Sequence, residues 1–125
     1  MNFIRRFHLF LIVVLVLIAG CAAAFSADSP ILDRVASSGV LRVGMSGDQA
    51  PMNAKARSGQ IIGLEVDLAN LLAAAMEVKV ELVTKPFPEL LPALKAGEVD
   101  IVMSGMTITR DRTAEVSFVG PYMIS

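Results

Sequence analysis

The chain has very few of the side chains that most enzymes and metalloproteins use for chemistry. Its 125 residues include one cysteine, Cys21, one histidine, His8, and no tryptophan. A body that lacks histidine and internal cysteine cannot build a Ser-His-Asp triad, a Cys-His pair or a soft-ligand metal site. A disulfide within the chain is excluded too, because there is no second cysteine. We therefore expect neither a bound metal nor an organic cofactor.

The sequence also has little excess charge. Its formal net charge is −1, and two of its eleven basic residues, Arg5 and Arg6, lie near the amino terminus. Without that pair, 9 basic residues face 12 acidic ones. This balance lacks the positive footprint of a nucleic-acid-binding protein, so we expect no nucleic-acid partner. The length argues for at most one domain.

Residues 1–20 resemble a targeting segment rather than part of the fold. Arg5 and Arg6 precede an apolar run over residues 9–19 that is too short to span a bilayer comfortably, which needs about 20 apolar residues. A short basic region followed by a short apolar run is typical of a signal peptide. We therefore predict that residues 1–20 are a signal peptide and that residues 21–29 form a tether.

The end of this segment allows two kinds of processing. The tetrad Ile18-Ala19-Gly20-Cys21 resembles a bacterial lipobox, which implies cleavage before Cys21, acylation of its sulfur and anchoring to the membrane. An ordinary signal peptide cut after Ala24 is the alternative, because Ala22 and Ala24 meet the small-x-small rule.

The rest of the chain alternates between helical and strand-like patterns. Helices are predicted over residues 30–39, 63–76 and 87–96, and strands over residues 40–45, 78–85, 99–103 and 116–119. Strands and helices that alternate with short connections imply parallel pairing through right-handed crossovers. The predicted fold class is therefore α/β, with a mainly parallel sheet flanked by helices.

Polar and glycine-rich residues follow three of the predicted strands, in segments 44–53, 85–87 and 104–112. In open parallel sheets ligands bind beyond the carboxyl ends of the strands. The segment that begins at Val99 has apolar residues for a core, and then small and hydroxylated residues before Arg112. We interpret this arrangement as a crevice for a small carboxylated solute.

Four ordered blocks of the sequence resemble one protein family. They are Val40–Gly44 (VLRVG), Gly63–Leu68 (GLEVDL) followed by Leu72, Ala73 and Met76, Pro86–Arg112 (PFPELLPALKAGEVDIVMSGMTITRDR), and Phe118–Met123 (FVGPYM). In this order they are similar to the extracellular solute-binding proteins, family 3, of bacterial amino-acid ABC importers. The resemblance covers about residues 30–125.

The resemblance implies a fold, a location and partners. Its fold is a pair of α/β lobes that close over a solute, as in periplasmic binding proteins. By this resemblance residues 30–125 are an incomplete lobe one that ends at the hinge crossing, and the second lobe is absent from the chain. The implied function is non-enzymatic capture of a polar amino acid in the periplasm or at the cell surface, with delivery to an ABC permease. Half of a clamp is expected to bind more weakly than the whole.

The resemblance also implies a set of ligand-binding residues. Arg112 matches the arginine that holds the ligand α-carboxylate, and Thr107 matches a residue whose hydroxyl and N–H reach the same group. Gly105 matches a glycine whose carbonyl faces the ligand amino group, and Phe87 an aromatic that packs on the ligand side chain. The alternatives are a solvated arginine, a turn hydroxyl, a turn glycine and a core phenylalanine.

The loop after the first strand departs from the commoner family pattern. Where many members have an acidic residue and then an aromatic one, this chain has Ser46 and Gln49, with Asp48 nearby. Gln49 and Asp48 are candidate ligand-binding residues, although Asp48 is equally well explained as a loop charge. Glu65 and Asp67 are two residues apart and point to different faces of their helix, so we interpret them as complementing its dipole.

Two other functions fit the same resemblance. The fold is similar to that of periplasmic cyclohexadienyl or arogenate dehydratases, which are enzymes. It is also similar to ligand-sensing domains of receptor kinases and of membrane-bound lytic transglycosylases.

Overall fold

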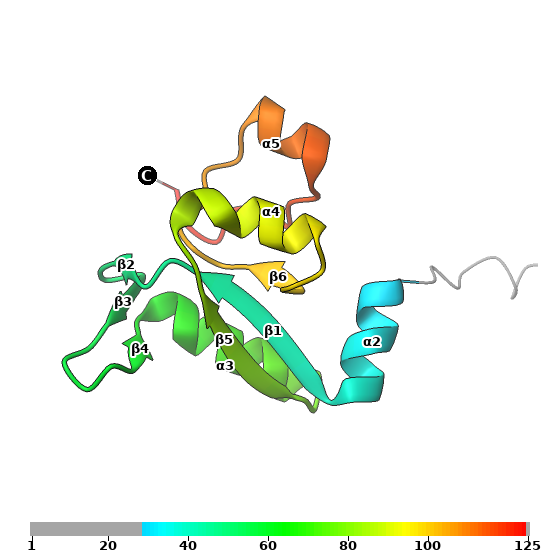
Figure 1. Cartoon of the computed structure of the whole chain (residues 1–125), viewed down its shortest axis with the longest axis horizontal. Helices are drawn as coiled ribbons and strands as arrows, with labels where there is room; N and C mark the ends of the chain where they lie inside the picture. The colour runs from blue at the N-terminus through cyan, green and yellow to red at the C-terminus, as the bar shows by residue number, and fades with distance from the viewer. Residues whose placement is uncertain (1–28, 125) are drawn as a thin grey trace, which may run out of the picture.

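The computed structural model describes residues 29–124 (Figure 1). The predicted signal peptide, the lipidation candidate Cys21 and most of the predicted tether lie outside the described residues. None of the helices within residues 29–124 is long and apolar enough to cross a membrane.

The core of the fold is a three-stranded parallel sheet. Its strands are β1 (Val40–Met45), β5 (Lys79–Thr84) and β6 (Ile101–Val102), in the order β5-β1-β6. Strand β1 is in the middle because the chain adds β5 on one side and then crosses to add β6 on the other. This confirms the predicted α/β class with a parallel sheet.

Helices α3 (Leu64–Ala75) and α4 (Leu90–Lys95) pack on opposite faces of the sheet. Three β1 side chains, Leu41, Val43 and Met45, join the buried cluster that α3 completes from its inner face. On the other face, Gly44 leaves room for Leu90 of α4, because a Cβ at Gly44 would lie 3.4 Å from the Leu90 side chain. The alternation of a strand explains why successive residues of β1 face different helices.

Sequence patterns placed most of these elements but misjudged three of them. The helix predicted over residues 87–96 is a 3-10 turn, η2 (Phe87–Glu89), followed by α4, and prolines at 88 and 92 remove two N–H donors from this segment. Strand β6 is shorter than the predicted 99–103. The strand predicted over 116–119 is wrong, since that segment makes no strand pairing within residues 29–124.

A second, antiparallel sheet lies where the sequence predicted only a loop. It consists of β2 (Asp48–Gln49), β3 (Asn53–Lys55) and β4 (Ile61–Ile62), in the order β2-β3-β4. The backbone carbonyls of Pro51 and Met52, next to β3, accept hydrogen bonds from the first two N–H groups of α3, at 3.2 and 2.9 Å. This small sheet therefore caps the helix with backbone instead of a side chain.

An ion-pair cluster closes the amino-terminal edge of the large sheet. Helix α2 (Pro30–Ser38) has Ser29 as its N-cap, as predicted, and carries Arg34 to the Asp100 carboxylate. The Arg42 guanidinium pairs with Asp100 at 3.0 Å, and the Arg42 backbone N–H donates to it at 2.8 Å. Only 3% of the Asp100 side chain is exposed. Burial by itself would raise the pKa of Asp100, but the Arg42 and Arg34 hydrogen bonds outweigh it, and the pKa is lowered.

The Asp100 cluster predicts a loss of stability in acid. Because its pKa is lower in the folded than in the unfolded chain, its contribution is complete above about pH 4 and is lost as the pH falls through the folded pKa. We expect Asp100→Asn to lower the free energy of unfolding at pH 7 by about 2 kcal/mol and to flatten its fall below about pH 4. Urea unfolding across this pH range measures both. Glu81→Gln removes an exposed carboxylate near Arg42 and should change stability by less than about 0.5 kcal/mol; an equal loss in both variants would contradict the prediction.

Candidate functional site

The three segments predicted to form the site do meet at one edge of the parallel sheet. Met45 of β1 is paired in register with Thr84 of β5, and Gly44 with Val102 of β6, so the strands end together. Backbone hydrogen bonds continue the alignment past the strands, from Lys85 N–H to the Met45 carbonyl at 3.2 Å. The crevice region is therefore bounded by the loops that follow β1, β5 and β6.

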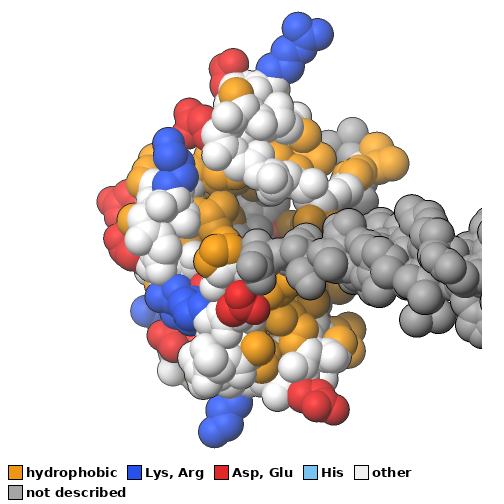
Figure 2. Space-filling view, turned by 90° about the vertical axis from the view of Figure 1, so that its right-hand side faces the viewer, with side chains coloured by type: hydrophobic (Ala, Val, Ile, Leu, Met, Phe, Trp, Pro, Cys, Tyr) orange, Lys and Arg blue, Asp and Glu red, His pale blue; other side chains and the backbone are white. Residues whose placement is uncertain are grey.

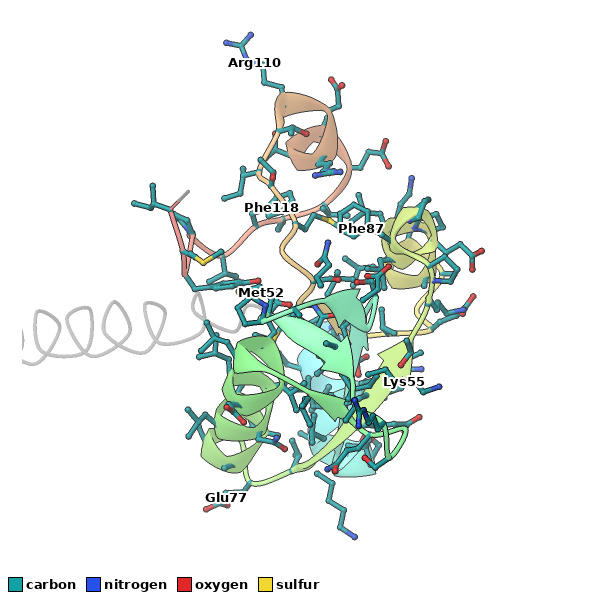
Figure 3. The ribbon with its side chains drawn as sticks, turned by 90° about the vertical axis from the view of Figure 1, so that its left-hand side faces the viewer. Met52, Lys55, Glu77, Phe87, Arg110 and Phe118 are labelled. Atoms are coloured by element: carbon teal, nitrogen blue, oxygen red, sulfur yellow. The ribbon has the colours of Figure 1, made fainter. Side chains whose placement is uncertain are left out.

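The Arg112 guanidinium lies over the loop that follows β5. Arg112 is in α5 (Arg110–Glu115), whose N-cap is Thr109. Its Cζ is 5.6 Å from the centre of the Phe87 ring, and its Nη1 donates to the Thr107 carbonyl at 2.9 Å. The structure thus brings three of the predicted site residues together. Figure 3 shows Phe87 between α5 and the sheet.

Arg112 also differs from its helical neighbour in its surroundings. Arg110 projects from the far end of α5, away from the sheet (Figure 3), and is exposed. Arg112 is half-buried, and within residues 29–124 it is in none of the four ion pairs. A guanidinium without a carboxylate partner, held by a carbonyl and an aromatic ring, is able to take a carboxylate in bidentate fashion.

A second group of polar side chains connects the loops after β1 and β6. Ser104 is fully buried, and its Oγ accepts from the Ser46 N–H at 3.0 Å. The same Oγ is within hydrogen-bond distance of Ser46 Oγ, at 3.0 Å, and Gln49 Oε1, at 3.3 Å. Gln49 lies against Gly105, where an added Cβ would be 3.1 Å from Gln49 Oε1. Gln49 and Gly105 are therefore neighbours in space.

Asp48 is placed differently from the other candidates. It is an exposed residue of β2, paired with Ala54 across the small sheet. The structure thus separates Asp48 from the buried polar group that holds its neighbour Gln49.

The sequence analysis missed the most connected residue of the region, Glu65. Its side chain is fully buried in the first turn of α3. One oxygen, Oε1, accepts from the Gly105 N–H at 2.6 Å and from the Tyr122 hydroxyl, and the other accepts from Asn53 Nδ2. Complementing the helix dipole is thus only part of the role of Glu65, because its carboxylate also joins three distant segments. The signal in the sequence was a glutamate in a mainly apolar helix, since a glutamate that such a helix buries almost always has hydrogen-bond partners.

Asn53 extends this network to the loop after β1. Its Oδ1 accepts from the Gly47 N–H at 2.6 Å and lies 3.3 Å from Ser46 Oγ. Asn53 is fully buried, and so are Glu65 and Ser104. Two of the loops that bound the crevice, those after β1 and β6, are therefore held in place by hydrogen bonds to buried groups, which are costly to leave unpaired.

Figure 2 shows the side of the molecule that lies on the right in Figure 1, away from the strand ends, and hydrophobic side chains are exposed there among charges of both signs. A hollow of about 590 Å³ lies between α5 and residues 116–120, lined by Ile108 and Phe118 among others. It is beside α5 rather than between the strand ends, so we do not identify it with the crevice.

The sequence matches a family description over most of its length. Residues 41–125 match the bacterial extracellular solute-binding proteins, family 3. The chain is 42% identical over 83 residues to a probable histidine-binding protein of Neisseria gonorrhoeae, covering 66% of this chain and 31% of that protein. It is 35% identical over 98 residues to the L-arginine-binding protein of Pseudomonas aeruginosa, covering 78% and 34%. A cyclohexadienyl dehydratase of the same organism is 34% identical over 102 residues, covering 82% and 38%.

Solved structures give the same result for the fold. An ancestral cationic amino acid solute-binding protein superposes with a TM-score of 0.72 at 47% identity, covering 74% of this chain and 40% of that one. The arginine-bound domain 1 of TmArgBP superposes with a TM-score of 0.70 at 38% identity, covering 71% of each chain. The chain spans about a third of the length of the curated relatives that it matches. The family match over residues 41–125 leads to the conclusion that this chain belongs to the bacterial extracellular solute-binding proteins of family 3.

Proposed function

We propose that this chain is part of the extracytoplasmic receptor of an amino-acid ABC importer, and that it binds the α-carboxylate of a polar amino acid. The observation that carries the proposal is the Arg112 guanidinium, which is in no ion pair within residues 29–124 and is held over Phe87 by the Thr107 carbonyl where the parallel strands end. Charge-assisted hydrogen bonds to a carboxylate are among the strong ones, each contributing about 1.5–3 kcal/mol.

The names of several relatives support an amino acid as the solute. They are described as binding histidine, arginine, lysine, ornithine or cystine. The TmArgBP structure is of domain 1 and is described as arginine-bound, which supports binding of an amino acid by one lobe. Arginine is therefore the first probe for this chain.

Calorimetric titration with arginine and with agmatine, which is arginine without its α-carboxylate, tests the proposal directly. Arginine should bind measurably, and agmatine at least about tenfold more weakly, because only arginine has the group that Arg112 would hold. Lysine, histidine and cystine complete the panel. Equal affinities for arginine and agmatine would contradict a carboxylate site, and no binding of any of the amino acids would contradict the receptor function.

A second candidate function is dehydration of an aromatic-pathway precursor. It is favoured by the 34% identity to a cyclohexadienyl dehydratase and by the superposition on an ancestral one at 40% identity. Incubating the protein with prephenate or arogenate and assaying for the decarboxylated aromatic product separates an enzyme from a receptor. We favour the receptor, because most of the named relatives are binding proteins.

We also propose a location outside the cytoplasm, with attachment to the membrane through a lipid on Cys21. The family name and the tetrad Ile18-Ala19-Gly20-Cys21 support this location. Cells grown with labelled palmitate should incorporate the label into the wild-type protein and not into Cys21→Ser. Release of the wild-type protein in soluble, unlabelled form would instead support an ordinary signal peptide cut after Ala24.

A further inference from the structure

The Glu65 carboxylate is fully buried, and it holds the segment that leads to Arg112. Its Oε1 accepts from the Gly105 N–H at 2.6 Å, and Gly105 is an exposed residue with a backbone φ of +53°. Two residues later, the Thr107 carbonyl accepts from Arg112 Nη1 at 2.9 Å. One buried carboxylate and one guanidinium are thus attached to the two ends of a segment of three residues.

The bond to Glu65 fixes the orientation of a whole peptide group. The N–H of Gly105 and the carbonyl of Ser104 belong to the same trans peptide and point in opposite directions. Holding that N–H on Glu65 therefore turns the Ser104 carbonyl away from the buried carboxylate. Ser104 Oγ is fixed independently by the Ser46 N–H at 3.0 Å, so the start of the segment is held at its backbone and at its side chain.

Glu65 Oε1, which accepts from the Gly105 N–H, also accepts a hydrogen bond from a third segment. Tyr122, near the end of the described residues, donates its hydroxyl to Glu65 Oε1, 57 positions away in sequence. Burial and the hydrogen bond to Glu65 raise the pKa of Tyr122 above its ordinary value. The hydroxyl of Tyr122 and the N–H of Gly105 therefore share one acceptor, and a movement of either segment changes the environment of the other.

We propose that Glu65 is a positioning residue for the amino-acid site, which sets the conformation of residues 104–107 and links that conformation to the segment of Tyr122. The proposal rests on the proposed function for its ligand, but the linkage itself is a property of the free protein. A helix-capping role alone would predict that any acidic residue in the first turn of α3 is equivalent. Asp67 is an exposed acidic residue in that turn and supplies the matched control.

The test compares Glu65→Gln with Asp67→Asn in three measurements. Glu65→Gln should weaken arginine binding about tenfold, whereas Asp67→Asn should stay within about twofold of wild type. In Glu65→Gln the amide proton of Gly105 should move upfield in NMR spectra, since it loses its charged acceptor. The phenol of Tyr122, the only tyrosine in a chain without tryptophan, should ionise at lower pH when followed by its ultraviolet absorbance.

The possible results separate a positioning role of Glu65 from a purely structural one. A purely structural Glu65 would lower the unfolding temperature while the Gly105 amide, the Tyr122 titration and the arginine affinity stay as in wild type, and this result would overturn the linkage. If Glu65→Gln does not fold, the test is instead the rate of hydrogen exchange of the Gly105 amide in the wild-type protein. Slow exchange at this exposed residue supports the bond, and fast exchange overturns it. Failure of wild type to bind arginine would count against the proposed function, while the NMR and absorbance measurements would still test the linkage.

Discussion

Replacing Arg112 by alanine is expected to weaken arginine binding by about 100-fold, because two charge-assisted hydrogen bonds to the α-carboxylate are lost. Within residues 29–124 the guanidinium is in no ion pair, so its charge is available to the ligand rather than spent on the fold. Arg112→Lys keeps the charge but not the planar fork, and should recover only part of the affinity. Isothermal calorimetry with arginine measures all three proteins.

Arg110 supplies the control for this prediction. It occupies the same short helix, is exposed and points away from the sheet (Figure 3), so Arg110→Ala should bind arginine within about threefold of wild type. Circular dichroism should show that both alanine variants remain folded. Equal affinities in Arg112→Ala and wild type would remove Arg112 from the site, and an equal loss in the two alanine variants would indicate a nonspecific effect of charge.

Replacing Gly63 by alanine is expected to lower the free energy of unfolding by at least about 3 kcal/mol. Gly63 has a φ of +136°, and a Cβ there would lie 2.3 Å from the Met52 carbonyl oxygen and 2.8 Å from the Pro51 carbonyl oxygen. Both carbonyls cap the first N–H groups of α3. A methyl group at Gly63 therefore pushes the small sheet away from the helix that carries Glu65. Urea or thermal unfolding measures the loss.

Gly97 separates the steric cost from the cost of backbone conformation. Its φ is +74°, but nothing lies within 4 Å of an added Cβ. Gly97→Ala should therefore cost only about 1–2 kcal/mol, which is the penalty of a left-handed conformation for an L-residue. A loss at Gly63 no larger than at Gly97 would show that the loop at Met52 moves freely, and would contradict the tight capping arrangement.

Local patterns in the sequence were sufficient for the elements of the large sheet. Ser29 and Pro30 start α2, alternation over 40–45 and 78–85 marks β1 and β5, and Gly97 ends the helical segment before β6. These signals depend on the residue's own conformational preference and on one buried face, and both are visible in a single segment. The predicted crevice followed from them, because parallel strands end at one edge.

Other features depended on partners that are far away in sequence. The segment 116–119 has an apolar pattern suited to a strand, but Val119 is 92% exposed and no strand within residues 29–124 pairs with it. Strands β2 to β4 are two or three residues long, and their short sequences have no pattern that distinguishes them from a loop. Pairing, rather than propensity, decided both cases.

The sequence by itself determined the family and the order of the strands and helices of the large sheet, because these follow from residue types at short spacing. It also predicted Arg112 as the binder of a carboxylate. The tertiary structure alone decided that Glu65 joins Asn53, Gly105 and Tyr122, at separations of 12, 40 and 57 positions. Hydrogen bonds between groups so distant in sequence leave no local pattern. They are formed only when folding removes water from Glu65 and leaves these three donors as the partners of its carboxylate within the described chain.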